Sequence, residues 1–222
     1  AAYRALKKGL HVYCEKPLTH TPHEARVLTE LARTMGVATQ MGNQNHAREG
    51  NRRTVELVRA GAIGTVREVH VMTDRPGNWW KQGLARPTEK PAVPGNLDWD
   101  LWLGPADVRP YHRHYAPFDW RAWWDFGCGA VGDMACHLMD CAWWALDLGG
   151  PVRVAAMGPP VLSDCGPTWM IVRFEFRARG DLPPVNVYWY EGTAKPADPI
   201  AKDLPVNGSL SVSYTHLTLP TN

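Results

Sequence analysis

Asp133 and His137 are four residues apart in a segment with a strong helical pattern, and this spacing suits acid–base chemistry. Side chains four positions apart on an α-helix share one face. A carboxylate beside an imidazole orients the ring and favours the imidazolium, which suits a residue that takes a proton from a hydroxyl. The glycines of Gly127-Cys128-Gly129 allow a substrate to approach the backbone just before this pair. The pattern leaves open an ordinary ion pair on a helix face.

The tripeptide Glu15-Lys16-Pro17 is a second candidate, because it follows the short apolar run Leu10–Cys14. Loops at the carboxyl ends of parallel strands open into the crevice that binds ligands in α/β proteins. The Lys16 ammonium can donate there to a substrate oxygen or a cofactor ribose, and Pro17 fixes the backbone that aims it. An ordinary surface lysine in a salt bridge is the alternative.

Polar and aromatic residues elsewhere provide further binding candidates. The run Asn43–His46 follows an apolar segment, and its amides can bond a carboxamide or a sugar hydroxyl, or simply cap the loop. Residues 75–126 are rich in Trp, whose flat amphipathic rings suit a polar cleft as well as a core. An arginine among tryptophans can also be stacked for structural reasons alone. The candidates in this segment are Arg75, Trp79, His112, Trp120 and Arg121.

Cysteines around His137 raise the alternative of a zinc site. Cys128, Cys136 and Cys141 are close to it in sequence, and Cys and His are zinc ligands. No CxxC pair occurs, however, and the ligands of the helical segment do not converge on one point. The odd total of five cysteines also argues against a disulfide framework. We therefore predict no metal site and reduced thiols.

The composition limits the class of protein. The 222 residues are 45% hydrophobic and 21% charged, which is typical of globular proteins and excludes wholesale disorder. The net charge is +2, whereas binding to nucleic acid or to a membrane surface needs a concentrated basic excess. No apolar run approaches the length of a membrane span. We expect no nucleic-acid or membrane partner and a cytoplasmic location, with export left open.

The elements that must position these residues alternate between helix and strand at the start of the chain. A helix is expected over Ala2–Lys8, with buried strands of the parallel type over 10–14 and 37–41. Between the strands, Thr21-Pro22-His23-Glu24 combines an N-cap, a Pro at the first helical position and a capping-box Glu. This predicts a helix that ends at Met35. The alternation is typical of a parallel α/β sheet.

The rest of the chain predicts a second sheet. Alternating residues over 66–73 indicate an amphipathic strand of an antiparallel sheet, with Val69, Val71 and Thr73 on one face. The irregular segment 75–126 has the character of a substrate loop or lid. Helices are expected over 47–60 and 130–148, and strands over 152–157, 170–177 and 185–190.

Together these features resemble the glucose–fructose oxidoreductase and inositol dehydrogenase family, of the Gfo/Idh/MocA type. The matching features are Glu15-Lys16-Pro17 after a strand, the helix over 21–35, the pair Trp120-Arg121 and the glycine-rich approach to Asp133-x-x-x-His137. The resemblance extends from residue 1 to about residue 190. It implies a Rossmann parallel sheet (α/β) followed by an α/β domain with an open, mostly antiparallel sheet (α+β).

The resemblance also implies a reaction, which is hydride transfer between NAD or NADP and a hydroxyl carbon of a sugar, polyol or sugar derivative. Lys16 would contact the substrate hydroxyl and the nicotinamide ribose. His137 would be the acid/base, and Asp133 its substrate-binding partner. The expected cofactor contacts are Glu15, Lys16, Pro17, Asn43, Trp120 and Arg121, and the expected substrate contacts are Arg75, Trp79, His112, Asp133 and His137.

The sequence departs from the family pattern at its start. No G-x-G-x-x-G precedes the first predicted strands and no acidic ribose-binding residue follows the second, so NAD and NADP cannot be distinguished. We therefore expect residues 1–45 to be the end of a Rossmann domain whose first strands are missing. Residues 46–210 would be an incomplete substrate and oligomerisation domain, and residues 211–222 a foreign tail. The fragment by itself is expected to be inactive.

Two other functions remain as alternatives to the dehydrogenase. One is an NAD-dependent glycoside hydrolase that acts through transient oxidation, and the other is a sugar-binding relative without turnover. The joint presence of Lys16, Asp133 and His137 argues against the second. The intact parent protein is expected to form a dimer or tetramer through the second sheet.

Overall fold

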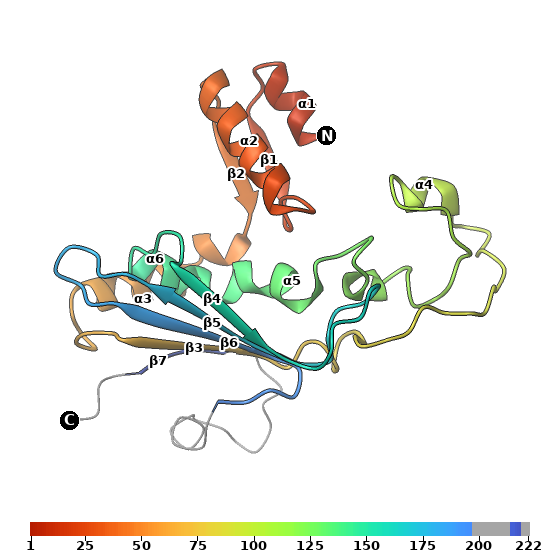
Figure 1. Ribbon diagram of the computed structural model, residues 1–222. Helices are drawn as coiled ribbons and strands as arrows, with labels where there is room; N and C mark the ends of the chain where they lie inside the picture. Colours follow the sequence, from red (N-terminus) through yellow and green to blue (C-terminus); the bar gives the residue numbers. More distant parts are fainter. Residues whose placement is uncertain (197–213, 219–222) are drawn as a thin grey trace.

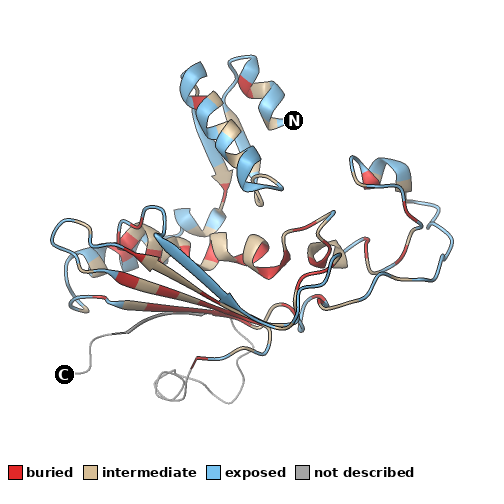
Figure 2. Ribbon diagram, viewed as in Figure 1, coloured by how far each residue is buried: buried red, intermediate tan, exposed pale blue. Residues whose placement is uncertain are grey.

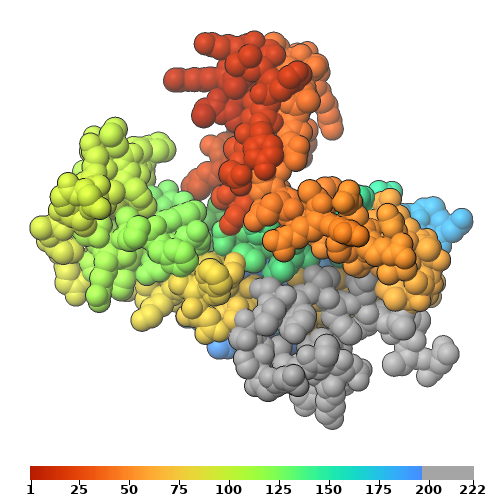
Figure 3. Space-filling view, turned by 180° about the vertical axis from the view of Figure 1, so that it is seen from behind, coloured from red at the N-terminus to blue at the C-terminus, as the bar shows by residue number. Residues whose placement is uncertain are grey.

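The computed structural model describes residues 1–196 and 214–218, which form two sheets flanked by helices (Figure 1). A two-stranded sheet belongs to the N-terminal unit, which forms a lobe that meets the rest of the molecule at its base (Figure 3). The larger sheet has the strand order β4-β5-β6-β3-β7. Its strands are β3 (Glu68–Thr73), β4 (Arg153–Met157), β5 (Met170–Phe176), β6 (Val185–Glu191) and β7 (Tyr214–Thr218).

The N-terminal unit follows the predicted alternation of helix and strand. Its elements are α1 (Ala2–Lys7), β1 (Val12–Glu15), α2 (Pro22–Met35) and β2 (Thr39–Gly42). The predicted capping box is present, since the Thr21 hydroxyl accepts from the backbone N–H of Glu24 and the Glu24 carboxylate accepts from that of Thr21. Gly36 ends α2 in the left-handed conformation.

The strands β1 and β2 pair in parallel, as predicted, but they are not buried on both faces. Val12 and Cys14 lie against Leu6 and Leu28 of the two helices, with which they line a small cavity. The opposite face is open, and Tyr13 is 60% exposed. The prediction of buried strands is therefore wrong, because both helices lie on the same side of this short sheet.

The larger sheet confirms the predicted open, mostly antiparallel architecture. Among the described strands, β4 with β5, β5 with β6 and β3 with β7 pair antiparallel, whereas β3 with β6 is parallel. Helices cover one face of this sheet (Figure 1). They are α3 (Glu49–Arg59), α5 (Gly129–Leu138) and α6 (Asp140–Ala145), and the 3-10 turn η1 (Gln44–Ala47) links them to β2.

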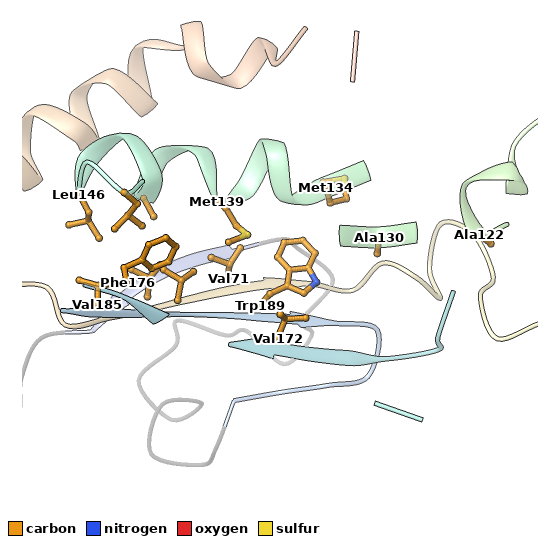
Figure 4. Close-up of a cluster of buried hydrophobic side chains, with 14 of the residues drawn as sticks. Val71, Ala122, Ala130, Met134, Met139, Leu146, Val172, Phe176, Val185 and Trp189 are labelled. Atoms are coloured by element: carbon orange, nitrogen blue, oxygen red, sulfur yellow. The ribbon is translucent and has the colours of Figure 1, made fainter. Parts of the chain in front are cut away.

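The hydrophobic core lies between these helices and the sheet (Figure 4). Val71 and Trp189 are completely buried on the sheet face, and Met139 and Leu146 lie over the strands from the helical side. Burying one such side chain stabilises the fold by about 1.5–3 kcal/mol. Burial is concentrated in this layer (Figure 2), so α5 rests on the best-packed part of the molecule.

Two predicted elements differ from the structure. The helix expected over 130–148 is interrupted at Met139, which separates α5 from α6. The strand expected over 66–73 should leave one face open, yet His70 and Met72 are buried together with Val71. The amphipathic interpretation is wrong because the outer face of β3 is also buried, and His70 stacks there against Tyr188 of β6.

Residues 75–126 form the long irregular segment that the sequence predicts. Its regular elements in the structure are the short helix α4 (Trp99–Leu103) and the 3-10 turn η2 (Asp119–Ala122). Stacked rings stabilise it, with the centroids of Trp99 and Trp102 separated by 4.9 Å. The segment extends away from the sheet (Figure 1), and its role as a lid stays a prediction.

The expected foreign tail, residues 211–222, lies mostly outside the described residues. The backbone of Tyr214–Thr218 pairs with β3 as β7, and the origin of the tail stays a prediction. The expected domain limit at residues 45 and 46 falls within η1 and also stays a prediction. In the part of the chain that the structure describes, no helix is both long and apolar enough to span a membrane.

Candidate active site at the junction

Lys16 and Asp133 form an ion pair that connects the N-terminal unit to α5. Lys16 follows β1 directly, whereas Asp133 lies 117 residues later in the middle of α5. The Lys16 ammonium donates to Oδ1 of the carboxylate. The two side chains are 22% and 8% exposed, so water screens this pair less than a surface ion pair. The two motifs found separately in the sequence therefore belong to one site.

Arg121 reaches the same carboxylate from the irregular segment. Its Nε lies 3.8 Å from Oδ1 of Asp133, and its Nη1 donates to the carbonyl oxygen of Phe118. The guanidinium carbon lies 4.5 Å from the ring centroids of both Phe118 and Trp120, and these contacts orient the planar cation. Two cations from different elements thus converge on Asp133.

His137 lies one helical turn after Asp133 and is buried. Its Nδ1 has no hydrogen-bond partner among the described residues. Burial lowers the pKa of His137, the Lys16 ammonium lowers it further, and Asp133 raises it. Burial therefore outweighs the Asp133 carboxylate, which by itself favours the imidazolium as the sequence analysis expects. A neutral imidazole with an unpartnered ring nitrogen can accept a proton.

The glycines before and within α5 allow close backbone approach. A Cβ on Gly127 would lie 2.6 Å from the carbonyl oxygen of Arg121, so a larger residue would displace that arginine. A Cβ on Gly132 would collide with the side chain of Cys128. The letters of Gly127–Gly132 fit G-x-G-x-x-G, but the run follows η2 rather than a strand. Its glycines therefore serve packing and are not a dinucleotide fingerprint.

Arg75 approaches α5 from the end of β3. Its guanidinium donates to the sulfur of Met134, the residue after Asp133, and lies over the indole of Trp79 at 3.8 Å from the ring centroid. Its charge adds to the effects that lower the pKa of His137. The structure therefore brings the predicted substrate residues Arg75 and Trp79 to the same end of α5.

The remaining candidates of the N-terminal unit lie around Lys16. Asn43 directly follows β2, and its Oδ1 is buried without a partner among the described residues. Glu15 lies over Gly42 of the neighbouring strand, and the peptide between Lys16 and Pro17 is cis. The loops after β1 and β2 open at the same edge because the strands are parallel.

His112 is not brought to this group of residues. It is buried within the irregular segment, where its ring contacts those of His114 and Tyr115. Its Nε2 lies 3.4 Å from the Glu89 carboxylate. Across the described ranges, none of its polar or ring contacts is with α5 or with the N-terminal unit, so its expected substrate contact gains no support from this geometry.

Two sequence profiles of one family match the chain in tandem. Residues 1–43 match the profile described as "Oxidoreductase family, NAD-binding Rossmann fold", and residues 50–181 match "Oxidoreductase family, C-terminal alpha/beta domain". The chain belongs to the Gfo/Idh/MocA oxidoreductase family. The resemblance noted in the sequence is confirmed, and so is the fold class of a Rossmann part followed by an α/β domain. No curated protein sequence matches the chain.

Solved structures share the Gfo/Idh/MocA fold with the chain at low identity. An NAD-binding protein from Listeria innocua is 19% identical, with a TM-score of 0.56 over 87% of this chain and 43% of its own. The WlbA dehydrogenase from Chromobacterium violaceum, solved with NADH and UDP-GlcNAcA, is 16% identical. Its TM-score is 0.56, and the match covers 88% of this chain and 46% of the dehydrogenase. An inositol dehydrogenase homolog from Azotobacter vinelandii, solved with NADH and myo-inositol, is 17% identical. Its TM-score is 0.53, and the match covers 88% of this chain and 42% of the homolog. The chain spans less than half the length of these structures.

The described residues fit the nicotinamide end of the cofactor that the Gfo/Idh/MocA profile names. The unpartnered acceptor of Asn43 and the ammonium of Lys16 lie at one edge of the parallel strands, where α/β proteins bind ligands. From the second domain, Arg121 lies against Asp133, and the ring of Trp120 lies against the Arg121 guanidinium. Residues 1–43 contain no G-x-G-x-x-G, so the loop that binds the cofactor phosphates is not among them.

Two further contacts at the junction were not predicted from the sequence. Nε2 of His20 lies 2.5 Å from the carbonyl oxygen of Trp124. Nδ1 of His46 lies 3.0 Å from the Asp140 carboxylate, and its ring stacks on Trp144. The place of His46 in the polar run after the second predicted strand could have indicated a site residue. Nothing in the local sequence identifies the partners of His20 or His46, however.

The cysteines near the site are half-buried and protonated. Burial raises the pKa of the Cys128, Cys136 and Cys141 thiols. Within residues 1–196 and 214–218, no group of three or more His, Cys, Asp or Glu side chains is arranged to hold a metal ion.

Proposed function

We propose that the chain carries the acid–base part of the active site of a nicotinamide-dependent oxidoreductase. The enzyme would transfer a hydride between the cofactor and a hydroxyl carbon of a sugar, polyol or sugar derivative. One observation carries the proposal: Lys16 of the Rossmann part is bonded to Asp133, one helical turn before the buried imidazole of His137, whose Nδ1 has no partner among the described residues. A cation, a carboxylate and a free ring nitrogen in one place suit proton transfer from a hydroxyl.

In this mechanism His137 accepts the proton of the substrate hydroxyl, since burial and the nearby cation keep its imidazole neutral. The Lys16 ammonium donates to the hydroxyl oxygen and stabilises the negative charge that develops as the proton leaves. Asp133 holds the ammonium in position and accepts from a neighbouring substrate hydroxyl. The cofactor, when bound, supplies the hydride acceptor for the carbinol carbon. In the reverse direction His137 returns the proton.

The substrate class is supported by the ligands of two similar structures. One was solved with UDP-GlcNAcA and the other with myo-inositol, and both contain NADH. We therefore propose a carbohydrate or polyol substrate with NAD as the cofactor, and NADP is the alternative to be tested. Because other dehydrogenases recycle these cofactors in the cytoplasm, the proposal includes a cytoplasmic location.

Turnover of a His137 variant tests the proposal. In the protein expressed from the complete reading frame, a panel of sugars and polyols is assayed with NAD and NADP by the absorbance of the reduced cofactor. His137→Ala should lower kcat by about 10²–10⁴-fold and leave cofactor affinity nearly unchanged, since a general base is lost. His11→Gln, an exposed histidine of the N-terminal unit, is the matched control.

Three results would contradict the dehydrogenase assignment. Wild-type turnover in His137→Ala would remove the acid–base role. Release of an aglycone without net reduction of the cofactor would indicate hydrolysis through transient oxidation. Carbohydrate binding without any turnover would indicate a sugar-binding relative.

The proposal also includes a homodimer or homotetramer. The strand β4 is an edge of the larger sheet, and all five of its residues are exposed. Val154 and Met157 are 54% and 59% exposed. An apolar edge strand with unpaired backbone groups is a surface that a second copy can cover. Light scattering should give a mass above that of the monomer, and a clean monomer would reject this part of the proposal.

A further inference from the structure

Arg75 lacks a carboxylate partner in the part of the chain that the structure describes. Its guanidinium donates to the thioether sulfur of Met134, and its Nε is buried with no acceptor. The indole of Trp79 covers one face of the guanidinium at 3.8 Å from the ring centroid. Trp79 is itself 55% exposed, so solutes can reach this stacked pair.

The other charged groups around the site are engaged with one another. Lys16 and Arg121 both lie against the Asp133 carboxylate. The Asp140 carboxylate contacts the ring of His46. These contacts give the carboxylates of the site other partners, and among residues 1–196 and 214–218 the Arg75 side chain has only a sulfur acceptor.

The chemistry of this guanidinium favours an oxyanion. A thioether is a weak acceptor, and a buried N–H without a partner destabilises the protein unless a ligand satisfies it. The planar fork of an arginine matches the two oxygens of a carboxylate or phosphate and binds them through paired hydrogen bonds. The stacked indole fixes the plane of the fork, so little side-chain freedom remains to be lost on binding.

We propose that the carbohydrate that reacts beside His137 carries a carboxylate or phosphate group, and that Arg75 binds this group. The inference rests on the proposed function and narrows its substrate class to anionic carbohydrates. Arg75 follows β3 and packs on α5, which both belong to the second domain. The nicotinamide-side candidates follow β1 and β2, so the oxyanion belongs to the substrate and not to the cofactor.

Calorimetry with matched ligands tests this inference in the protein expressed from the complete reading frame. The probes are glucose, glucuronate and glucose 6-phosphate, and myo-inositol with myo-inositol 1-phosphate. In at least one series an anionic member should bind about 10- to 100-fold more tightly than its neutral counterpart, as a charged hydrogen bond would give. Comparison of glucuronate with glucose 6-phosphate distinguishes a carboxylate from a phosphate. Arg75→Gln should remove the advantage and Arg75→Lys should restore part of it.

Arg52→Gln is the matched control, because Arg52 is an exposed arginine of α3 in the same domain. No anionic advantage in any series, or an advantage that survives in Arg75→Gln, would overturn the inference. Loss of NAD affinity in Arg75→Gln would overturn it as well, since the oxyanion would then belong to the cofactor. The proposed function is judged separately by formation of the reduced cofactor, so it can stand when this inference fails.

Discussion

At the residue scale, the protonation of His137 depends on charges supplied by several elements. Burial lowers the pKa of His137, and the ammonium of Lys16 and the guanidinium of Arg75 lower it as well. The carboxylates of Asp133 and Asp140 act in the opposite direction. Because the lowering effects prevail, the imidazole is neutral near physiological pH and available as a base.

Removal of the Lys16 charge should raise the pKa of His137. Lys16→Gln deletes a cation that disfavours the imidazolium and leaves the Asp133 carboxylate without its ammonium partner, and both changes act in the same direction. An NMR titration of the His137 ring protons in the 222-residue chain measures the shift. Lys7→Gln, an exposed lysine of α1, should leave the titration unchanged. An unchanged or lower pKa in Lys16→Gln would contradict this account of the site.

Glu191 should make the stability of the fold depend on pH. Burial raises its pKa to about 7 from an ordinary 4.5, although the Trp189 indole donates to the carboxylate and acts against this. The protonated form stabilises the fold fully below pH 4.5, and this contribution is lost as the pH rises to about 7. Glu191→Gln should remove this loss. Between low pH and pH values above about 7, the free energy of unfolding should therefore fall by roughly 2–3 kcal/mol more in the wild type than in the variant.

Urea unfolding at several pH values from about 4 to about 8 measures how the free energy of unfolding of each variant depends on pH. Glu30→Gln, an exposed glutamate of α2, is the control and should show the pH dependence of the wild type. Parallel curves for the wild type and Glu191→Gln would show that the buried carboxyl does not titrate as described.

At the element scale, the position of α5 depends on glycines that let η2 pack against its start. Gly127→Ala would bring a Cβ within 2.6–2.8 Å of three backbone atoms of Arg121. We expect it to lower the free energy of unfolding by about 1–3 kcal/mol and to move Arg121 away from Asp133. Urea unfolding measures the loss. Gly95→Ala, where nothing lies within 4 Å, should change stability by less than about 0.5 kcal/mol. Equal stability of the two variants would contradict the packing role of Gly127.

Elements that depend on neighbours close in sequence were predictable. The capping box over Thr21–Glu24 and the shared helix face of Asp133 and His137 need contacts only three or four residues apart. The burial of His70 was not predictable, because it depends on Tyr188 and Tyr190 of the distant strand β6. Periodicity describes one strand or helix, and it contains no information on which neighbours will cover it.

The site residues were likewise predictable where they depend on local motifs and not where they depend on contacts between distant segments. Lys16 and Asp133 were each identified from a local motif, but their ion pair connects elements 117 residues apart and needs the folded chain. The opposing effects of Asp133 and Lys16 on the pKa of His137 follow from their charges, but the burial that lowers this pKa most depends on the folded chain. His112 carried no local signal that could separate a buried ring cluster from a substrate contact.

At the scale of the whole molecule, the candidate site lies at the junction of the two parts of the chain. The N-terminal lobe meets the second domain at its base (Figure 3), where Lys16 contacts Asp133 and His20 contacts the backbone of Trp124. The Rossmann part therefore supplies the ammonium, and the second domain supplies the imidazole and the carboxylate. The account requires that residues from both parts act together on one substrate hydroxyl.

A double-mutant cycle on kcat/KM measures this cooperation most directly. Lys16→Ala, His137→Ala and the double variant are compared with the wild type, in the protein expressed from the complete reading frame and with its best carbohydrate substrate. Groups that act as one unit give strongly non-additive losses. The account predicts that each single variant loses about 10²-fold or more and that the double variant loses little beyond the larger single loss. Losses that multiply, or wild-type activity in either single variant, would contradict a shared proton-transfer site.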